Sequence, residues 1–294
     1  MRLGSKYFRC REGAWSLWIR REEWQADLWQ VVLALIEKQP PAKHPQTLQL
    51  DAPLGAGGDV LFLKIFHGSS GVRLFKDIFR ASKALRSMRQ GAALARLNFN
   101  VPLAIAVGEQ REYRLLRKAF VLTVGLKGEP LPVFLRQHSL GVESMSWLEK
   151  RNGLKQLALE VRRLHELGFV HGDLVPTNVF VARTAKKENR LFFMDNDRTR
   201  RYPKWFPQVF WRRNLVQLNR IPLAGITLQD RVRFLSYYLG LTEWGSKERR
   251  LLSWLERKTR QRRRECDFVD ANGSFRQLMQ WQGDLKNDSW VHNV

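Results

Sequence analysis

Three oxygen-bearing side chains lie at positions where they could share one metal ion. Asp173 and Asn178 belong to one short loop within Val170–Val181, and Asp195 ends the apolar stretch of the next motif, Phe192–Asp197. Mg²⁺ prefers octahedral oxygen ligands and is usually held by one or two carboxylates together with substrate phosphates. The pattern therefore predicts a site for a magnesium nucleotide, with Asn178 and Asp195 as the metal ligands.

The loop aspartate, Asp173, has a separate predicted role as the catalytic residue. In kinases the loop Asp accepts the proton of the acceptor hydroxyl or orients it, while the loop Asn and the strand-end Asp hold metal. Each motif alone is weak, because Gly and Asp are also common turn residues. Both motifs occur in the required order beside apolar strands expected at Val179–Ala182 and Leu191–Met194, which favours the kinase interpretation.

A candidate for binding the nucleotide phosphates lies on a predicted hairpin formed by Thr47–Leu50 and Val60–Phe66. Alternation along the second strand places the ammonium of Lys64 on one face of the sheet, where a nucleotide could lie across it. An exposed strand lysine is the simpler alternative. Gly55–Gly58 lies close before Lys64 and is interpreted as the hairpin turn, with phosphate contact through its backbone amides left open.

The remaining elements predict an α+β chain with a bilobal, protein-kinase-like fold. We expect a small antiparallel-sheet N-lobe at residues 1–124, which binds nucleotide, and a larger, mainly helical C-lobe at residues 125–294 with the catalytic loop. Gly125–Pro132 resembles a hinge. The expected helices are Trp24–Glu37, Arg73–Leu97 and Trp147–Leu167. The further expected strands are Leu103–Val107, Tyr113–Leu116 and Ala119–Val124.

One departure from the kinase pattern concerns the partner of Lys64. Protein kinases supply a Glu from the helix that follows this strand. The segment Ile78–Val107 contains neither Asp nor Glu, so the sequence offers Gln90, or Asp77 at the helix start, in its place. This departure motivates the alternative of a non-catalytic kinase fold.

The charge balance indicates an anionic partner. The chain of 294 residues has 51 Lys and Arg against 28 Asp and Glu, a formal net charge of +23. Tryptophans cluster with arginines in Trp15–Trp29 and Trp205–Arg213, which suits either an anionic membrane surface or a lobe core. The basic run Arg257–Arg264 is interpreted as a solvated helix face, and no dedicated nucleic-acid site is expected.

Other features suggest where the chain works. No secretory signal or long apolar run is visible, and the longest early run, Val31–Ile36, is far shorter than the roughly 20 residues of a spanning helix. Cys10 and Cys266 lie far apart and are expected to be free thiols in a reducing compartment. These features predict a cytoplasmic protein that is soluble or peripheral on a membrane.

Several motifs together resemble the lipopolysaccharide kinase family, the Kdo and heptose kinases of the bacterial inner core. Besides the His171-Gly-Asp173 loop, Asn178 and the Asp195-Asn-Asp197-Arg198 motif, similar segments follow in order between about Phe62 and Leu239. These segments are Lys64–Phe66, Ser82–Arg96, Val101–Leu103, Leu215–Asn219 and Asp230–Leu235.

The resemblance implies transfer of phosphate from ATP, with Mg²⁺, to a Kdo or heptose hydroxyl of an anionic, lipid-anchored glycan at the inner membrane. Arg198 and Arg200 are weaker candidates for contacting the acceptor or the γ-phosphate. Gly172 stands where protein kinases carry an Arg, and no Ala-Pro-Glu element follows Asp195, so a small-molecule or sugar acceptor fits better than a protein. The alternative is a non-catalytic, kinase-like protein that binds lipopolysaccharide or another anionic partner.

Overall fold

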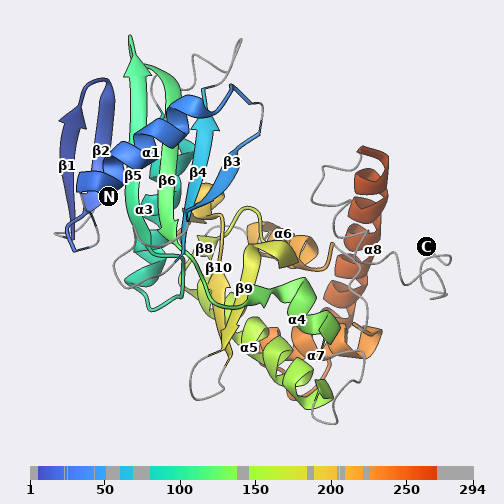
Figure 1. Ribbon diagram of the computed structural model, residues 1–294. Helices are drawn as coiled ribbons and strands as arrows, with labels where there is room; N and C mark the ends of the chain where they lie inside the picture. The colour runs from blue at the N-terminus through green and yellow to red at the C-terminus, as the bar shows by residue number, and fades with distance from the viewer. Residues whose placement is uncertain are drawn as a thin grey trace. The chain divides into compact units, whose positions relative to one another are not determined.

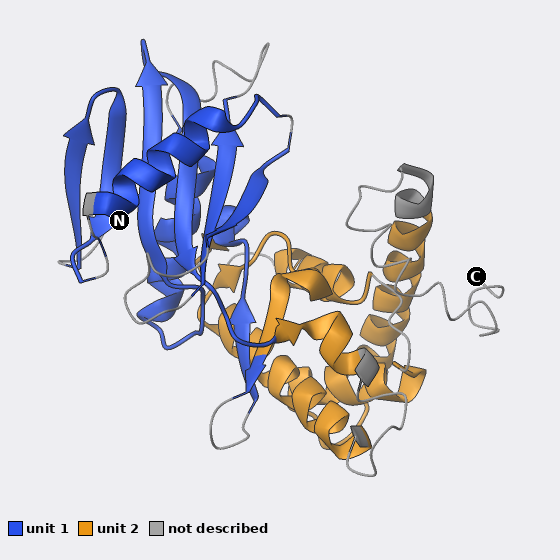
Figure 2. Cartoon of the chain, in the orientation of Figure 1, with its two compact units in different colours: residues 1–128, 182–199 blue, residues 129–181, 200–294 orange. Residues whose placement is uncertain are grey.

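The computed structural model describes most of the chain and separates it into two compact units. The described residues are 6–22, 24, 26–42, 44–50, 60–68, 80–137, 146–183, 189–203, 205, 209–220 and 226–269. Unit 1 comprises residues 1–128 and 182–199, and unit 2 comprises residues 129–181 and 200–294 (Figure 2). The predicted assignment of separate roles to residues 1–124 and 125–294 remains a prediction.

Unit 1 is built on a six-stranded antiparallel sheet in the order β1-β2-β5-β6-β4-β3 (Figure 1). The strands are β1 (Tyr7–Glu12), β2 (Trp15–Arg20), β3 (Gln46–Leu50), β4 (Leu61–His67), β5 (Ala104–Glu112) and β6 (Leu115–Val124). The predicted hairpin is present, since Thr47 of β3 pairs with Lys64 of β4. Its connection, which includes Gly55–Gly58, lies outside the described residues.

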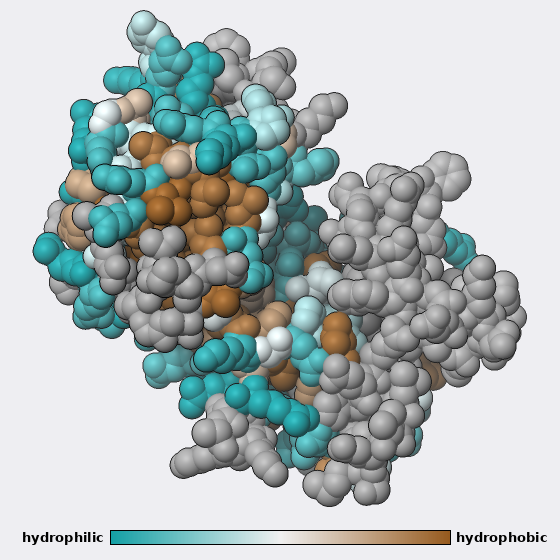
Figure 3. All heavy atoms as spheres, viewed as in Figure 1, coloured by the Kyte–Doolittle hydropathy of each residue, from teal (hydrophilic) through white to brown (hydrophobic). Residues whose placement is uncertain are grey.

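The two faces of this sheet pack against different helices. On one face, Leu61, Leu63 and Ile65 join a core with α1 (Ala26–Lys38). On the other, Phe66 packs with residues of α3 (Lys83–Ala95). Because side chains alternate along a strand, Lys64 shares the face of Phe66 and α3. In the view of Figure 3, hydrophobic residues gather over the sheet face that α1 crosses.

The first fifty residues form part of this unit. Trp15 of β2 and Trp29 of α1 are each 5% exposed and meet edge to face with ring centroids 6.0 Å apart, and both contact Phe120 of β6. Aromatic side chains of this size contribute a large buried area to a core. For these two tryptophans, the core interpretation therefore replaces the membrane interpretation. Trp205, in contrast, is 81% exposed.

The expected strands at 113–116 and 119–124 are one strand, β6. Tyr113 and Arg114 form the preceding turn with positive φ values of 48° and 67°. The pairing register of β5 with β6 shifts between Gln110, which pairs with Lys118, and Arg111, which pairs with Leu116. Arg117 is the extra residue at this irregularity, and β6 continues through it. The expected helix at 73–97 is described as α3, which Ser82 caps by accepting a hydrogen bond from the Leu85 amide (3.0 Å).

Unit 2 is mainly helical. Its helices are α4 (Leu131–Gln137), α5 (Ser146–Glu166), α6 (Val209–Leu218), α7 (Leu228–Leu239) and α8 (Ser246–Val269). The long helix α5 is followed by Gly168, whose φ of +82° and close approach to the Tyr202 carbonyl exclude a side chain. The short strand β8 (Phe169–Val170) comes directly after Gly168 and pairs with the short strand β11 (Arg200–Arg201). β8 leads into the loop of His171.

Candidate active site

In unit 1, Lys64 and Asp195 form an ion pair. The Lys64 Nζ lies 2.9 Å from the Asp195 Oδ1, with the two side chains 30% and 37% exposed. Asp195 follows β10 (Asn189–Phe193) and adopts a left-handed backbone, φ 50° and ψ 53°, which Asp tolerates better than most residues. Because both side chains remain partly accessible, Lys64 can leave Asp195 to bind an anion, and Asp195 can leave Lys64 to bind a cation.

The turn that carries Asp195 is fixed by the residue after it. Asn196 is 3% exposed, and its side-chain amide donates to the Phe193 carbonyl at 2.8 Å. Its side-chain oxygen accepts from the Thr199 hydroxyl at 3.3 Å. The buried Asn196 therefore closes the turn and limits where the Asp195 carboxylate can point.

A second carboxylate of the same turn, Asp197, faces α3. Its Oδ2 lies 3.8 Å from Nη2 of Arg86, and the Asp197 side chain is only 9% exposed. Burial, and next the neighbouring Asp195 charge, raise the pKa of the Asp197 carboxyl above its ordinary value, while Arg198, Arg86 and Lys83 oppose that rise. Sequence reasoning treated this residue only as part of a motif.

The partner of Lys64 differs from both sequence-based suggestions. Among the described residues Lys64 pairs with Asp195 and not with Gln90, and Asp77 lies outside them. Arg198 and Arg200 are both exposed. The described helix α3 has no acidic residue, so the kinase pattern of a lysine paired with a helix glutamate is absent from this part of the chain.

In unit 2, the loop that follows β8 brings Asp173 and Asn178 together. The side-chain amide of Asn178 donates to the backbone carbonyl of Asp173 at 2.9 Å, which leaves its amide oxygen available to a cation. Pro176 begins a short 3₁₀ turn, Pro176–Asn178, that places both side chains on one loop. Asp173 and Asn178 are partly exposed, while His171 before them is fully buried.

Two amides of α6 hold the backbone of this loop. Asn214 accepts from the His171 amide at 3.0 Å, and Gln217 accepts from the Leu174 amide at 3.4 Å. Gln217 also donates to the Gly172 carbonyl at 3.1 Å and accepts from the Asn214 side chain at 2.9 Å. From the sequence these residues had no predicted role, and Gln217 appeared only within the segment Leu215–Asn219. Two amide side chains three positions apart on one helix are the signal that could have indicated a polar network.

The network extends to a buried histidine of α5. Nε2 of His165 lies 3.1 Å from the side-chain Oδ1 of Asn214, and Nδ1 lies 2.8 Å from the Tyr238 hydroxyl. Burial lowers the pKa of His165 to about 4 and raises that of Tyr238 to about 12, so both are neutral near pH 7. Since the amide oxygen only accepts, His165 donates from Nε2 and accepts the Tyr238 proton at Nδ1.

The structure thus brings the four predicted site residues together as two pairs, one in each unit. A carboxylate from Asp195 and an amide oxygen from Asn178 are ligand types that suit Mg²⁺. Within the described ranges, no three His, Cys, Asp or Glu side chains form a metal-binding group of their own. No helix of the described part of the chain is long and apolar enough to cross a membrane.

Comparisons with known proteins identify the family. A sequence model described as the lipopolysaccharide kinase (Kdo/WaaP) family matches residues 51–238, more than half of the chain. The chain belongs to this lipopolysaccharide kinase family. A search of curated protein sequences found no match. Membership in this kinase family implies a phosphotransferase, and it implies the use of ATP.

A solved structure supports the same fold. It is titled "WaaP in complex with acyl carrier protein" and shares 22% sequence identity, with a TM-score of 0.57 over 78% of this chain and 91% of the other. Both the resemblance to the lipopolysaccharide kinase family and the α+β, protein-kinase-like fold predicted from the sequence are therefore confirmed.

Proposed function

We propose that this lipopolysaccharide kinase phosphorylates a Kdo or heptose hydroxyl of the lipopolysaccharide inner core, with ATP and Mg²⁺. The observation that carries the proposal is the 2.9 Å pair of Lys64 with Asp195, since it joins the expected phosphate-binding and metal-binding groups. A basic chain also suits an anionic acceptor, because its field concentrates such a ligand.

Each candidate side chain has a role in this reaction. Lys64 would exchange Asp195 for the α- and β-phosphates of ATP. Asp195 and the amide oxygen of Asn178 would hold Mg²⁺, which neutralises phosphate charge when bound. Asp173 would orient the acceptor hydroxyl for in-line attack and take its proton. Most of the rate enhancement would come from positioning and from charge neutralisation.

The test is transfer of ³²P from labelled ATP to a truncated inner-core lipopolysaccharide. The natural chain should label the glycan in the presence of Mg²⁺, and Asp195→Ala should not. Mass analysis of the product would identify the sugar and the hydroxyl. Nucleotide binding without label on any inner-core acceptor would count against this acceptor class.

The alternative, a non-catalytic kinase-like protein that binds lipopolysaccharide or another anionic partner, rests on the missing helix glutamate. It predicts lipopolysaccharide binding with no transfer of label and no need for Mg²⁺. The same experiment separates the two functions, because only an enzyme loses a product when Asp195 is replaced.

We also propose that the protein works at the cytoplasmic face of the inner membrane, bound peripherally through α8. Eight Lys and Arg side chains of this helix are exposed, and basic residues near an anionic surface contribute about 1 kcal/mol each. They are Lys247, Arg249, Arg250, Arg257, Lys258, Arg260, Arg262 and Arg264. Flotation with anionic liposomes should recover the protein, and replacing Arg257 and Arg260 by Glu should reduce recovery.

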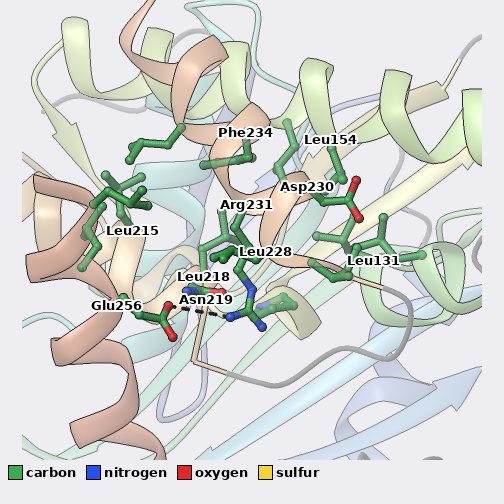
Figure 4. Close-up of a pocket in the computed structure, with 17 residues that line it drawn as sticks. Leu131, Leu154, Leu215, Leu218, Asn219, Leu228, Asp230, Arg231, Phe234 and Glu256 are labelled. Atoms are coloured by element: carbon green, nitrogen blue, oxygen red, sulfur yellow. Dashed lines mark ion pairs between the residues drawn. The ribbon is translucent and has the colours of Figure 1, made fainter. Parts of the chain in front are cut away.

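An acyl carrier protein is a further candidate partner, because the similar WaaP structure was determined in complex with one. Unit 2 contains a pocket of about 100 Å³ whose walls are mainly leucines, with the ion pair of Arg231 and Glu256 at one side (Figure 4). Apolar walls of this kind suit part of a hydrocarbon chain, and the volume would take a few of its methylene groups. An acylated carrier protein should raise the Tm, and Leu157→Trp, which fills the pocket, should abolish the rise.

A further inference from the structure

An arginine occupies the helix from which protein kinases supply a glutamate. Arg86 lies near the start of α3, with Nη2 at 3.8 Å from the Asp197 Oδ2, and the two side chains are 22% and 9% exposed. Helix α3 also packs against the 3₁₀ turn Asn196–Arg198. The helix therefore contacts the metal-binding motif directly, through a cation.

The charges of this region are arranged as two separate pairs on one turn. Asp195 pairs with Lys64 of β4, and Asp197 pairs with Arg86 of α3. Asn196 between them is buried and hydrogen-bonded to Phe193. Because Asn196 constrains the backbone between the two aspartates, a shift of Asp197 relative to α3 would also move Asp195.

The position of α3 is itself fixed by an acidic residue of the sheet. Glu109 of β5 is 6% exposed and accepts from the Ser82 amide at the start of the helix at 2.7 Å. Arg111 donates to Glu109 at 3.1 Å and to the Arg80 carbonyl at 2.8 Å. The start of α3 is thus held by an acid of the sheet, whereas the helix itself supplies a base, Arg86, to Asp197.

We propose that Arg86 is a positioning residue for phosphoryl transfer: by holding Asp197 it sets the place of Asp195, so that Asp195 keeps its orientation when Lys64 turns to the nucleotide. A helix glutamate is then unnecessary. This role of Arg86 rests on the proposed kinase function, because it concerns the alignment of Asp195, the proposed metal ligand.

The test has two measurements. The first is the affinity for a fluorescent ADP analogue as a function of Mg²⁺ concentration, with no acceptor present. The second is turnover with the acceptor. Arg86→Ala and the milder Arg86→Gln should each raise the Mg²⁺ concentration needed for half-maximal binding and lower kcat by about 10- to 100-fold. Arg86→Lys should restore most of both. Arg96→Ala, an exposed arginine at the end of the same helix, is the matched control and should change neither.

The outcomes separate this inference from the kinase proposal. If the natural chain binds no nucleotide at any Mg²⁺ concentration, the proposed function fails, and the role of Arg86 fails with it. If the natural chain binds and the Arg86→Gln variant shows the same Mg²⁺ dependence and the same kcat, the kinase proposal stands and the positioning role of Arg86 is excluded.

Discussion

The two halves of the candidate site are held by different kinds of interaction. In unit 1, Asp195 and Asp197 are held by the cations Lys64 and Arg86. In unit 2, the loop of Asp173 is held by uncharged amides, mainly Asn214 and Gln217. The partly exposed pair of Lys64 with Asp195 can be exchanged for phosphate and metal, whereas a buried neutral network keeps its geometry before and after binding. Unit 1 therefore suits the binding of charged ligands, and unit 2 holds the candidate catalytic loop in one conformation.

The largest effects on nucleotide affinity should come from removing charge in unit 1. Lys64→Ala should reduce kcat/KM by about 10²- to 10³-fold, because it removes a fixed positive charge from the transferring phosphates. Its nucleotide affinity should fall as well, as measured by titration with a fluorescent ADP analogue. Lys118→Ala is the control and should retain affinity, because Lys118 is a half-buried lysine of β6 whose Nζ donates to the Ile36 carbonyl of α1 at 3.2 Å.

A smaller effect, with a different kinetic signature, is expected from the amide network of unit 2. Asn214→Ala leaves the buried His171 amide and the His165 ring without their acceptor, so the free energy of unfolding should fall by about 1–3 kcal/mol. Displacement of the loop should lower kcat by about 10- to 100-fold with nucleotide affinity unchanged. Arg213→Ala, an exposed neighbour on α6, is the control. Loss of nucleotide affinity in Asn214→Ala, with kcat retained, would contradict the division of roles.

The smallest effect concerns the response of unit 2 to acid. His165 has a pKa of about 4 in the folded chain and 6.5 as its ordinary value, so the unfolded chain binds its proton first as the pH falls. The stabilisation from a neutral His165 is fully present above pH 6.5 and is lost as the pH falls toward 4. Between pH 7 and pH 5 it should decline by about 2 kcal/mol. Urea unfolding of His165→Gln should lack this component, and an identical pH dependence would rule out the assignment.

Much of the site could be predicted from local sequence. Strand alternation placed Lys64 on one face of a hairpin strand, and Phe66, on the same face, packs with α3 as expected from a period of two. The spacing of Asp173 and Asn178 predicted one loop, and the apolar run before Asp195 predicted a strand. These inferences depend only on residues close together in the chain.

The parts that could not be predicted depend on contacts between distant residues. The pairing of β2 with β5 joins residues near Trp15 to residues near Gln110, so local pattern alone left the role of the N-terminal tryptophans open. Asn214 is an ordinary helix residue until His171 is placed beside it. The partner of Lys64 was predicted from the kinase pattern, but this chain uses Asp195.

The most direct test of this account compares Asp173→Ala with Asp195→Ala in turnover and in nucleotide affinity. Because the proposed task of Asp173 arises in the transition state, its variant should lose about 10²- to 10⁴-fold in kcat while its affinity for ATP with Mg²⁺ stays close to that of the natural chain. Asp195→Ala should lose both turnover and Mg²⁺-dependent affinity. An Asp173→Ala protein that transfers phosphate to lipopolysaccharide as fast as the natural chain would contradict the central claim.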